Sequence, residues 1–248
     1  MGIKVFQIYM DKKTEARLEA GFEGHLNLKK DGYFENSVIR EKYEENIQAD
    51  YIGVTSWHQK DKTHFSAKEI IEHIQKDIDA GKGKDVYLYT PIQKCAVNQV
   101  NVPEGFDLNG KIRAMPIMTA HKFRGEPYTD DLLINNAGIL PFDLMDGKWQ
   151  YCYCNYWIAK KSVFDEYCKT VLIPVIDFLE RPEVKAKMPL WYKHWYDGVK
   201  YNSSCFIMEA LFGSFLAHSP YSHEYIYKEK FGKVFKKINI YQYEPTNK

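Results

Sequence analysis

Residues 51–89 read YIGVTSWHQKDKTHFSAKEIIEHIQKDIDAGKGKDVYLY, and this stretch contains three elements in order. The run 51–56 is apolar and β-branched, which predicts a buried strand. Ser66 and Glu69 have the spacing of a capping box, which predicts the start of a helix. The run 85–89 predicts a further strand. A strand, a helix and a strand in this order favour a βαβ unit in a mainly parallel sheet.

The flanking segments extend this pattern. Residues 3–9 (IKVFQIY) predict a first strand, residues 12–35 predict a polar loop, and Asn36 or Ser37 caps a helix that ends near Asp50. The remaining predicted elements are a short helix over 129–134, a strand over 149–159, helices over 162–179 (kinked at Pro174) and 203–217, and a strand over 238–243. We therefore expect an α/β fold with helices flanking the sheet, and a ligand at the carboxyl ends of the strands.

Composition sets broad limits on the class of protein. A length of 248 residues suits a single domain. The formal net charge of +1 indicates no global field for nucleic acid or membranes. Five cysteines without CxxC spacing favour reduced thiols in a cytoplasmic protein. There is no signal segment and no apolar run long enough to span a membrane, so we expect a soluble chain.

The polar loop after the second strand is a candidate for binding phosphate. Lys62 is able to neutralise the charge of a diphosphate, and the hydroxyl groups of Ser56 and Thr63 are able to donate hydrogen bonds to it. The alternative is an ordinary solvated loop.

Glu209 lies in a predicted helix that is apolar almost all round. A buried carboxylate needs a partner or a shifted pKa, which makes Glu209 a candidate general base. The alternative is a structural glutamate paired with a buried cationic or tyrosine side chain.

Asp130 and Asp131 are candidate ligands for Mg²⁺ or Mn²⁺. The alternative is a pair of carboxylates that stabilises the N-terminus of a helix.

Two further groups combine aromatic and cationic side chains. His194 and Trp195 are able to stack on a sugar, a base or a partner, but a place in the core or in a lid explains them equally well. The lysine-rich and aromatic stretch 225–237 fits either a phosphate-binding surface or an exposed amphipathic helix. Cys152 and Cys154 are expected on one face of a strand, packed in the core.

Several segments together resemble a group of bacterial glycosyltransferase-like proteins, including the domain found in capsular polysaccharide biosynthesis. The matching segments are residues 4–9, 51–56 with Lys62 and Thr63, 85–91, 154–160 and 206–209. The resemblance implies a GT-A-like (Rossmann-type) fold in one domain. It also implies a nucleotide-sugar-binding half over 1–91 and an acceptor half with C-terminal helices over 92–248.

The resemblance also implies roles for particular residues. The expected donor-binding residues are Gln7, Tyr9, Ser56, Lys62, Thr63, Asn155 and Tyr156. Glu209 corresponds to the acidic residue on the acceptor side, with Asp131 as another candidate base and His194 and Trp195 as acceptor-binding residues. The usual D-x-D turn is absent, since Asp85-Val86-Tyr87 begins its strand, so dependence on Mn²⁺ or Mg²⁺ stays open.

The leading hypothesis is therefore transfer of a sugar from a nucleotide-diphosphate sugar to a hydroxyl group of a polysaccharide or other glycan. One alternative acceptor is a hydroxymethylated base in DNA, as in phage DNA-modifying glycosyltransferases. A different alternative is an inactive sugar-binding or scaffold protein with the same fold.

Overall fold

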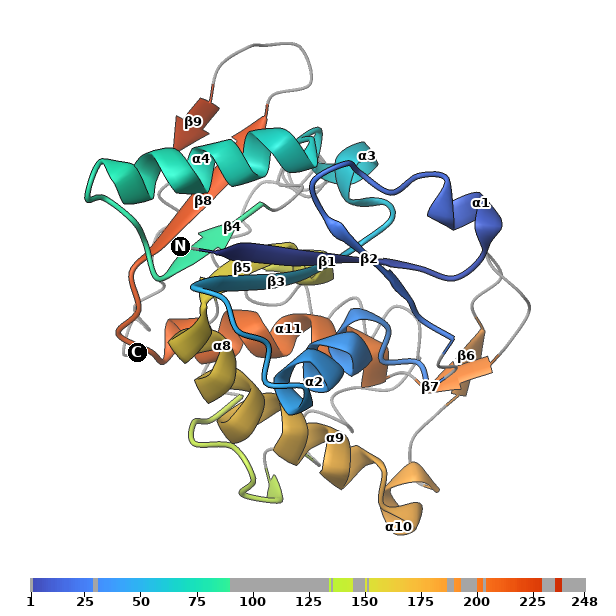
Figure 1. Cartoon of the computed structure of the whole chain (residues 1–248). Helices are drawn as coiled ribbons and strands as arrows, with labels where there is room; N and C mark the ends of the chain where they lie inside the picture. Colours follow the sequence, from blue (N-terminus) through green and yellow to red (C-terminus); the bar gives the residue numbers. More distant parts are fainter. Residues whose placement is uncertain are drawn as a thin grey trace, which may run out of the picture.

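A central sheet with helices on both faces forms a single mixed α/β domain in the computed structural model (Figure 1). The residues that the structure describes are 2–28, 31–89, 134, 136–144, 150, 152–186, 190–192, 200–202, 204–228 and 235–237. The predicted α/β fold with helices flanking the sheet is confirmed. The prediction of a mainly parallel sheet is wrong, because three of the six strand pairs of the central sheet are antiparallel in the described residues.

The central sheet has seven strands in the order β2-β1-β3-β5-β4-β8-β9. Their bounds are β1 Ile3–Tyr9, β2 Glu23–Leu26, β3 Tyr51–Ser56, β4 Val86–Leu88, β5 Trp157–Lys160, β8 His223–Lys228 and β9 Phe235–Lys237. β1 runs parallel to β2 and β3, and β4 runs parallel to β8. β5 lies between β3 and β4 and runs antiparallel to both, and β9 runs antiparallel to β8. A separate antiparallel pair joins β6 (Leu190–Tyr192) and β7 (Lys200–Asn202).

Helices cover both faces of the central sheet (Figure 1). Their bounds are α1 Lys12–Glu15, α2 Glu35–Glu44, α3 Gln59–Thr63, α4 Ala67–Asp79, α8 Lys161–Tyr167, α9 Ile173–Leu179, α10 Pro182–Lys185 and α11 Ser204–Ala217. α4 crosses one face, and α2, α8, α9 and α11 pack on the other. The capping box of Ser66 and Glu69 is present at the start of α4, as the sequence predicts.

Successive side chains along a strand point to opposite faces of the sheet, so the core is divided into two clusters, one on each face. In β4, Val86 and Leu88 belong to the cluster under α2, α8 and α11, whereas Tyr87 and the adjacent Tyr89 belong to the cluster under α4. All of these side chains are buried. A strand covered by helices on both faces is apolar throughout, because neither face meets water.

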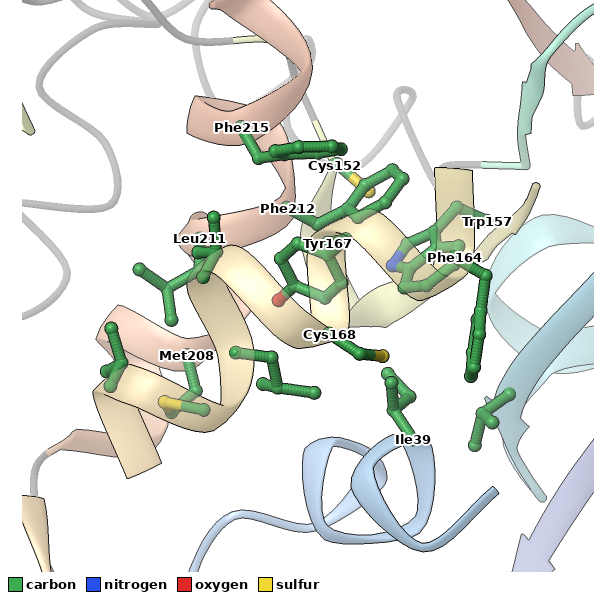
Figure 2. Close-up of a cluster of buried hydrophobic side chains, with 14 of the residues drawn as sticks. Ile39, Cys152, Trp157, Phe164, Tyr167, Cys168, Met208, Leu211, Phe212 and Phe215 are labelled. Carbon is green, nitrogen blue, oxygen red and sulfur yellow. The ribbon is translucent and has the colours of Figure 1, made fainter. Parts of the chain in front are cut away.

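The larger cluster has an aromatic centre formed by β5, α8 and α11 (Figure 2). The indole of Trp157 stacks on Phe212 with ring centroids 3.8 Å apart, and Tyr167 meets it edge-on at 5.8 Å. Burial of such rings removes large apolar areas from water. The late helix α11 is therefore held directly against the strand that begins at Trp157.

The loop after β1 contains an edge strand that the sequence did not predict. β2 is parallel to β1 and its side chains are mostly exposed or half-buried. An exposed edge strand joins the sheet through backbone hydrogen bonds, so it needs no alternation of apolar residues. Residues 12–35 therefore form more than a polar loop with one short helix.

The N-terminus of α2 differs from the predicted cap. Phe34 occupies the N-cap position with φ of 51°, and Asn36 and Ser37 lie buried inside the helix. The Ser37 hydroxyl donates to Asp31 Oδ2 at 2.6 Å, so it is bound away from the helix N–H groups. The prediction that Asn36 or Ser37 caps this helix is wrong, and the helix ends at Glu44 rather than near Asp50.

The predicted strand over 149–159 begins only at Trp157. Tyr153–Asn155 instead forms a 3₁₀ turn (η1), in which Cys154 and Asn155 have left-handed φ values of 62° and 53°. Cys154 therefore does not share a strand face with Cys152, and that prediction is wrong. Cys152 and Cys168 are buried, and Cys154 is half-buried.

The predicted helix over 162–179 is present as α8, a π-helical turn Cys168–Leu172 (η2) and α9. The change of hydrogen-bond pattern comes just before Pro174. Proline has no N–H and its ring crowds the preceding turn, and a π-helical turn accommodates such a disturbance.

The lysine-rich stretch near the C-terminus contains β8 and β9 instead of an exposed amphipathic helix, so the helical alternative is wrong for the described residues. Tyr225 is buried and its hydroxyl donates to Gln150 Oε1 at 2.9 Å. The predicted strand over 238–243 lies outside the described residues. Of the predicted helix over 129–134 the structure describes Ile134, which is helical and buried.

Candidate functional site

The carboxyl ends of β1 and β3 lie beside the start of β5. We call this end of the strands the carboxyl edge of the sheet. Ile8 in β1 is in register with Ser56 in β3. The backbone N–H of Tyr89, just after β4, donates to the carbonyl of Tyr156 at 2.8 Å, directly before β5. Because β5 runs against its neighbours, its first residues lie where the parallel strands end. This is the edge at which α/β sheets bind ligands.

Lys62 lies at this edge beside the turn that precedes β5. Its ammonium donates to Cys154 Sγ at 3.4 Å and lies 5.6 Å from the ring centroid of Tyr156. The Tyr156 hydroxyl shares a hydrogen bond of 2.7 Å with Ser56 Oγ. Three of the predicted donor-binding residues are thus brought together from two separate parts of the chain. They are Ser56, Lys62 and Tyr156, and we call them the Lys62 cluster.

The turn before β5 has an unusual backbone. Cys154 and Asn155 both have positive φ, a conformation that costs non-glycine residues of the order of 1 kcal/mol or more each and is frequent at functional sites. Asn155 is fully buried, and its Oδ1 accepts from Trp157 Nε1 at 3.4 Å. Its Nδ2 has no hydrogen-bond partner among the described residues. Asn155 therefore belongs to the predicted site by position, although its side chain points into the protein.

Gln7 lies beneath the carboxyl edge and hydrogen-bonds to β3 and to the segment after α1. Its side chain is fully buried, its Nε2 donates to the Ser56 carbonyl at 3.2 Å, and its Oε1 accepts from the Glu19 N–H at 2.7 Å. Both ends of the amide are used inside the protein. Gln7 therefore positions β3 and the segment after α1, and a bound donor is not needed to explain its hydrogen bonds.

Tyr9 and Thr63 contact other parts of the chain. A Cβ on Gly24 would be 3.6 Å from Tyr9 Cε1, which places the Tyr9 ring beside the edge strand β2. Thr63 is buried, and its Oγ1 accepts from Gln59 Nε2 at 2.7 Å and from the Phe65 N–H at 3.2 Å. Its hydroxyl thus holds the connection between α3 and α4.

Charged side chains link the loop after β1 to the loop after β3. Arg17 forms an ion pair with Asp61, and its guanidinium lies 4.5 Å from the centroid of the Trp57 ring. Lys60 pairs with Glu19 at 3.0 Å. Arg17 and Trp57 are not among the predicted donor-binding residues, although a cation and an aromatic ring that follow two parallel strands were a signal in the sequence.

Asp85 lies at the opposite end of β4 from the Lys62 cluster. Its carboxylate accepts hydrogen bonds from Lys160 Nζ at 2.9 Å and from the N–H and hydroxyl of Ser222. Partial burial alone would raise the pKa of Asp85, but these hydrogen bonds outweigh it and hold the pKa below its ordinary value. The hydrogen bond to Asp85 likewise raises the pKa of Lys160. Asp85 therefore ties strands together and does not replace a metal-binding D-x-D turn.

Several predicted site residues fall outside the described part of the chain. These are Asp130, Asp131, His194 and Trp195. The backbone of Glu209 is described as part of α11, but its side chain is not. The catalytic, metal-binding and acceptor-binding roles of these residues stay predictions.

Described residues line one small cavity and one open hollow. A cavity of about 10 Å³ beneath the site is lined by Thr55, Gln59 and Tyr156 among others, which is space for about one water molecule. An open hollow of about 590 Å³ lies between α2 and α8, and none of the predicted donor-binding residues lines it.

None of the helices in the described part of the chain has the length and apolar character that crossing a membrane requires.

No protein-family model and no curated protein matches the chain significantly. Among solved structures, the fold is similar to the apo structure of the WbbM bifunctional glycosyltransferase, with a TM-score of 0.43 and 15% sequence identity. The similar region covers 90% of this chain and 44% of that chain, so this chain spans less than half of that protein's length. Similarity at this level does not define an activity.

Proposed function

We propose that the chain is a glycosyltransferase that uses a nucleotide-diphosphate sugar and transfers the sugar to a hydroxyl group of a polysaccharide or other glycan. The observation that carries the proposal is the position of Lys62, whose ammonium lies beside Cys154 and the Tyr156 ring at the carboxyl edge of the sheet. A cation at this edge faces the place where such sheets bind phosphorylated ligands.

The proposed reaction leaves negative charge on the departing nucleoside diphosphate. A lysine fixed at that position stabilises the leaving group more in the transition state than in the ground state. Donor binding would exchange the contact between Lys62 and the Cys154 sulfur for a charge-assisted contact with a phosphate oxygen, which is stronger. Arg17 and Trp57 on the neighbouring loops offer a second cation and a ring on which a base stacks.

The proposal is tested by measuring donor binding to wild type and to Lys62→Met. We expect a selective rise in melting temperature with one class among UDP-, GDP- and dTDP-sugars, each tested with and without Mn²⁺, and no rise with CMP-sugars, which have a single phosphate. Lys62→Met should weaken donor binding by about 10- to 100-fold, the loss expected for a hydrogen bond to a charged group. Lys68→Met is the matched control, because Lys68 is an exposed lysine on α4 whose ammonium lies 3.7 Å from Glu72 Oε1.

The outcomes separate the proposed activity from its alternatives. Equal donor affinity in Lys62→Met and Lys68→Met would reject the donor site. Donor binding without sugar transfer to any of a broad panel of acceptors would indicate a sugar-binding or scaffold protein. Binding to DNA that weakens steeply with salt, with transfer to hydroxymethylated bases, would indicate the DNA-modifying alternative.

A further inference from the structure

Three side chains capable of binding a metal converge between α4 and β8. His73 and Asp77 are four residues apart on α4, so they lie on one face of the helix. Glu224 is in β8 beside Tyr87 of β4. One possible ligand atom from each of the three residues lies within 4.8 Å of the other two. The candidate donor site lies elsewhere, around Lys62 of α3 and the turn that precedes β5.

The separations within the cluster suit coordination better than hydrogen bonding. His73 Nε2 lies 3.6 Å from Asp77 Oδ2 and 3.7 Å from Glu224 Oε1. Both separations are too long for a good hydrogen bond. With metal–ligand bonds of about 2.1 Å, the ligand atoms of a tetrahedral site are about 3.4 Å apart. The same imidazole nitrogen is therefore close to both carboxylates at nearly the spacing that a shared cation requires.

The charges of the cluster also favour a cation. The three groups have two negative charges whenever the imidazole is neutral, and the Glu224 side chain is only 5% exposed. Two carboxylates beside one imidazole nitrogen concentrate negative charge, which attracts a cation most strongly where water is excluded.

We propose that His73, Asp77 and Glu224 bind a divalent transition-metal ion, with Zn²⁺ as the best-suited cation. One imidazole nitrogen and two carboxylate oxygens form a donor set that zinc accepts, and Mg²⁺ prefers oxygen ligands alone. His73 and Asp77 are 24% and 20% exposed, so a remaining coordination position faces solvent. Tyr87 supports the site, since its hydroxyl donates to Asp77 Oδ2 at 3.4 Å and its ring meets the His73 ring edge-on.

Such an ion would join the helix layer to the sheet. α4 contributes two ligands and β8 the third, and β8 is held to the rest of the central sheet through β4. Because the ion binds the folded state, it stabilises that state by an amount that rises with the logarithm of its concentration above the dissociation constant.

The test uses the full chain, stripped with a chelator and dialysed, with Zn²⁺, Mn²⁺ and Mg²⁺ added separately. We expect about one Zn²⁺ per chain by elemental analysis. A rise in melting temperature of about 5–10 °C is expected when the free Zn²⁺ concentration is about 100 times its dissociation constant. The effect of Mn²⁺ should be smaller and that of Mg²⁺ smaller still. Glu224→Gln and His73→Gln should each lose the bound Zn²⁺ and the rise in melting temperature.

Glu72→Gln is the matched control, because Glu72 neighbours His73 on α4 and its side chain is 64% exposed. It should bind Zn²⁺ like wild type. If the buried variant Glu224→Gln fails to fold, the more exposed His73→Gln decides the result. No Zn²⁺ binding by wild type, or unchanged binding in His73→Gln, would overturn the proposal. An effect of Mg²⁺ equal to that of Zn²⁺ would overturn it too, because the imidazole would then not be a ligand. No sugar donor is used, so the result is independent of the proposed activity.

Discussion

Gly53 lies where the backbone of β3 packs closely against β5. It is in register with Ile158, and a Cβ at this position would lie 2.7 Å from Ile158 Cγ1 and 2.8 Å from the Trp157 carbonyl oxygen. The second contact is with backbone, which cannot move without disturbing the sheet. Glycine is therefore required here by space.

We predict that Gly53→Ala destabilises the protein by about 2 kcal/mol or more, since it overpacks the centre of the sheet. Urea denaturation of the purified variants measures this loss. Gly2→Ala is the control, because no atom lies within 4 Å of a Cβ built there. Equal stability of the two variants would show that β3 and β5 are not in the described register.

Part of the candidate site could be predicted from the types of residue that follow the predicted strands. Ser56 and Lys62 follow a predicted parallel strand, so their place at the carboxyl edge was predictable. The contact between Lys62 and Cys154 was not, because it depends on two consecutive left-handed residues where the sequence favours a continuous strand. The burial of Gln7 and Thr63 was also not predictable. The Gln7 amide and the Thr63 hydroxyl are each able to bind either a ligand or the backbone.

At the scale of elements, Asp85 joins three strands at their far ends. It lies before β4, accepts from Lys160 at the end of β5, and accepts from Ser222, which precedes β8. The Lys160 N–H also donates to the Asp85 carbonyl at 2.8 Å. Side-chain and backbone bonds thus set the relative positions of the three strands.

We predict that Asp85→Asn lowers the free energy of unfolding at pH 7 by about 1–2 kcal/mol, through weaker hydrogen bonds and loss of the ion pair. The folded-state pKa of Asp85 is lowered, so this stabilisation is complete above the ordinary aspartate pKa of about 3.9 and is lost as pH falls through the folded pKa. The difference between wild type and variant should therefore shrink below about pH 4.

Urea denaturation at pH 7 and at pH 3 checks this expectation, with Asp79→Asn as the control. Asp79 is an exposed carboxylate on α4 that accepts from Gln75 at 2.7 Å. A difference between wild type and Asp85→Asn that stays constant over this pH range would contradict the role given to the carboxylate charge.

Elements with a strong local pattern were predictable, and elements defined by pairing were not. β1, β3 and α4 have apolar runs or a capping box of their own. β2 has neither, because it is held at the sheet edge by backbone hydrogen bonds. The antiparallel direction of β5 could not be predicted either, because a short apolar run has the same sequence pattern in a parallel and in an antiparallel strand.

At the scale of the molecule, the halves 1–91 and 92–248 share one sheet. Within the described residues, β3 from the first half pairs with β5 from the second, and β4 pairs only with β5 and β8. The first half alone would leave the apolar edge of β3 open. Unpaired apolar edges favour aggregation.

We predict that a fragment of residues 1–91 does not fold on its own, whatever share of the nucleotide site it contains. Circular dichroism and thermal unfolding should show no cooperative transition, and the fragment should aggregate. Mixing it with fragment 92–248 should restore a cooperative transition. A fragment 1–91 that unfolds cooperatively alone would show that the first half is an independent folding unit.

The place of β5 between β3 and β4 has a consequence for synthesis on the ribosome. About 70 residues separate Leu88 from Trp157, and at ~5–20 residues per second their translation takes roughly 4–14 s. For that time β4 has emerged without either of its partner strands, and β3 lacks one neighbour. A nascent chain in this interval is a natural client for a chaperone that shields apolar strands. Slow codons before residue 157 would lengthen its exposure, and faster ones would shorten it.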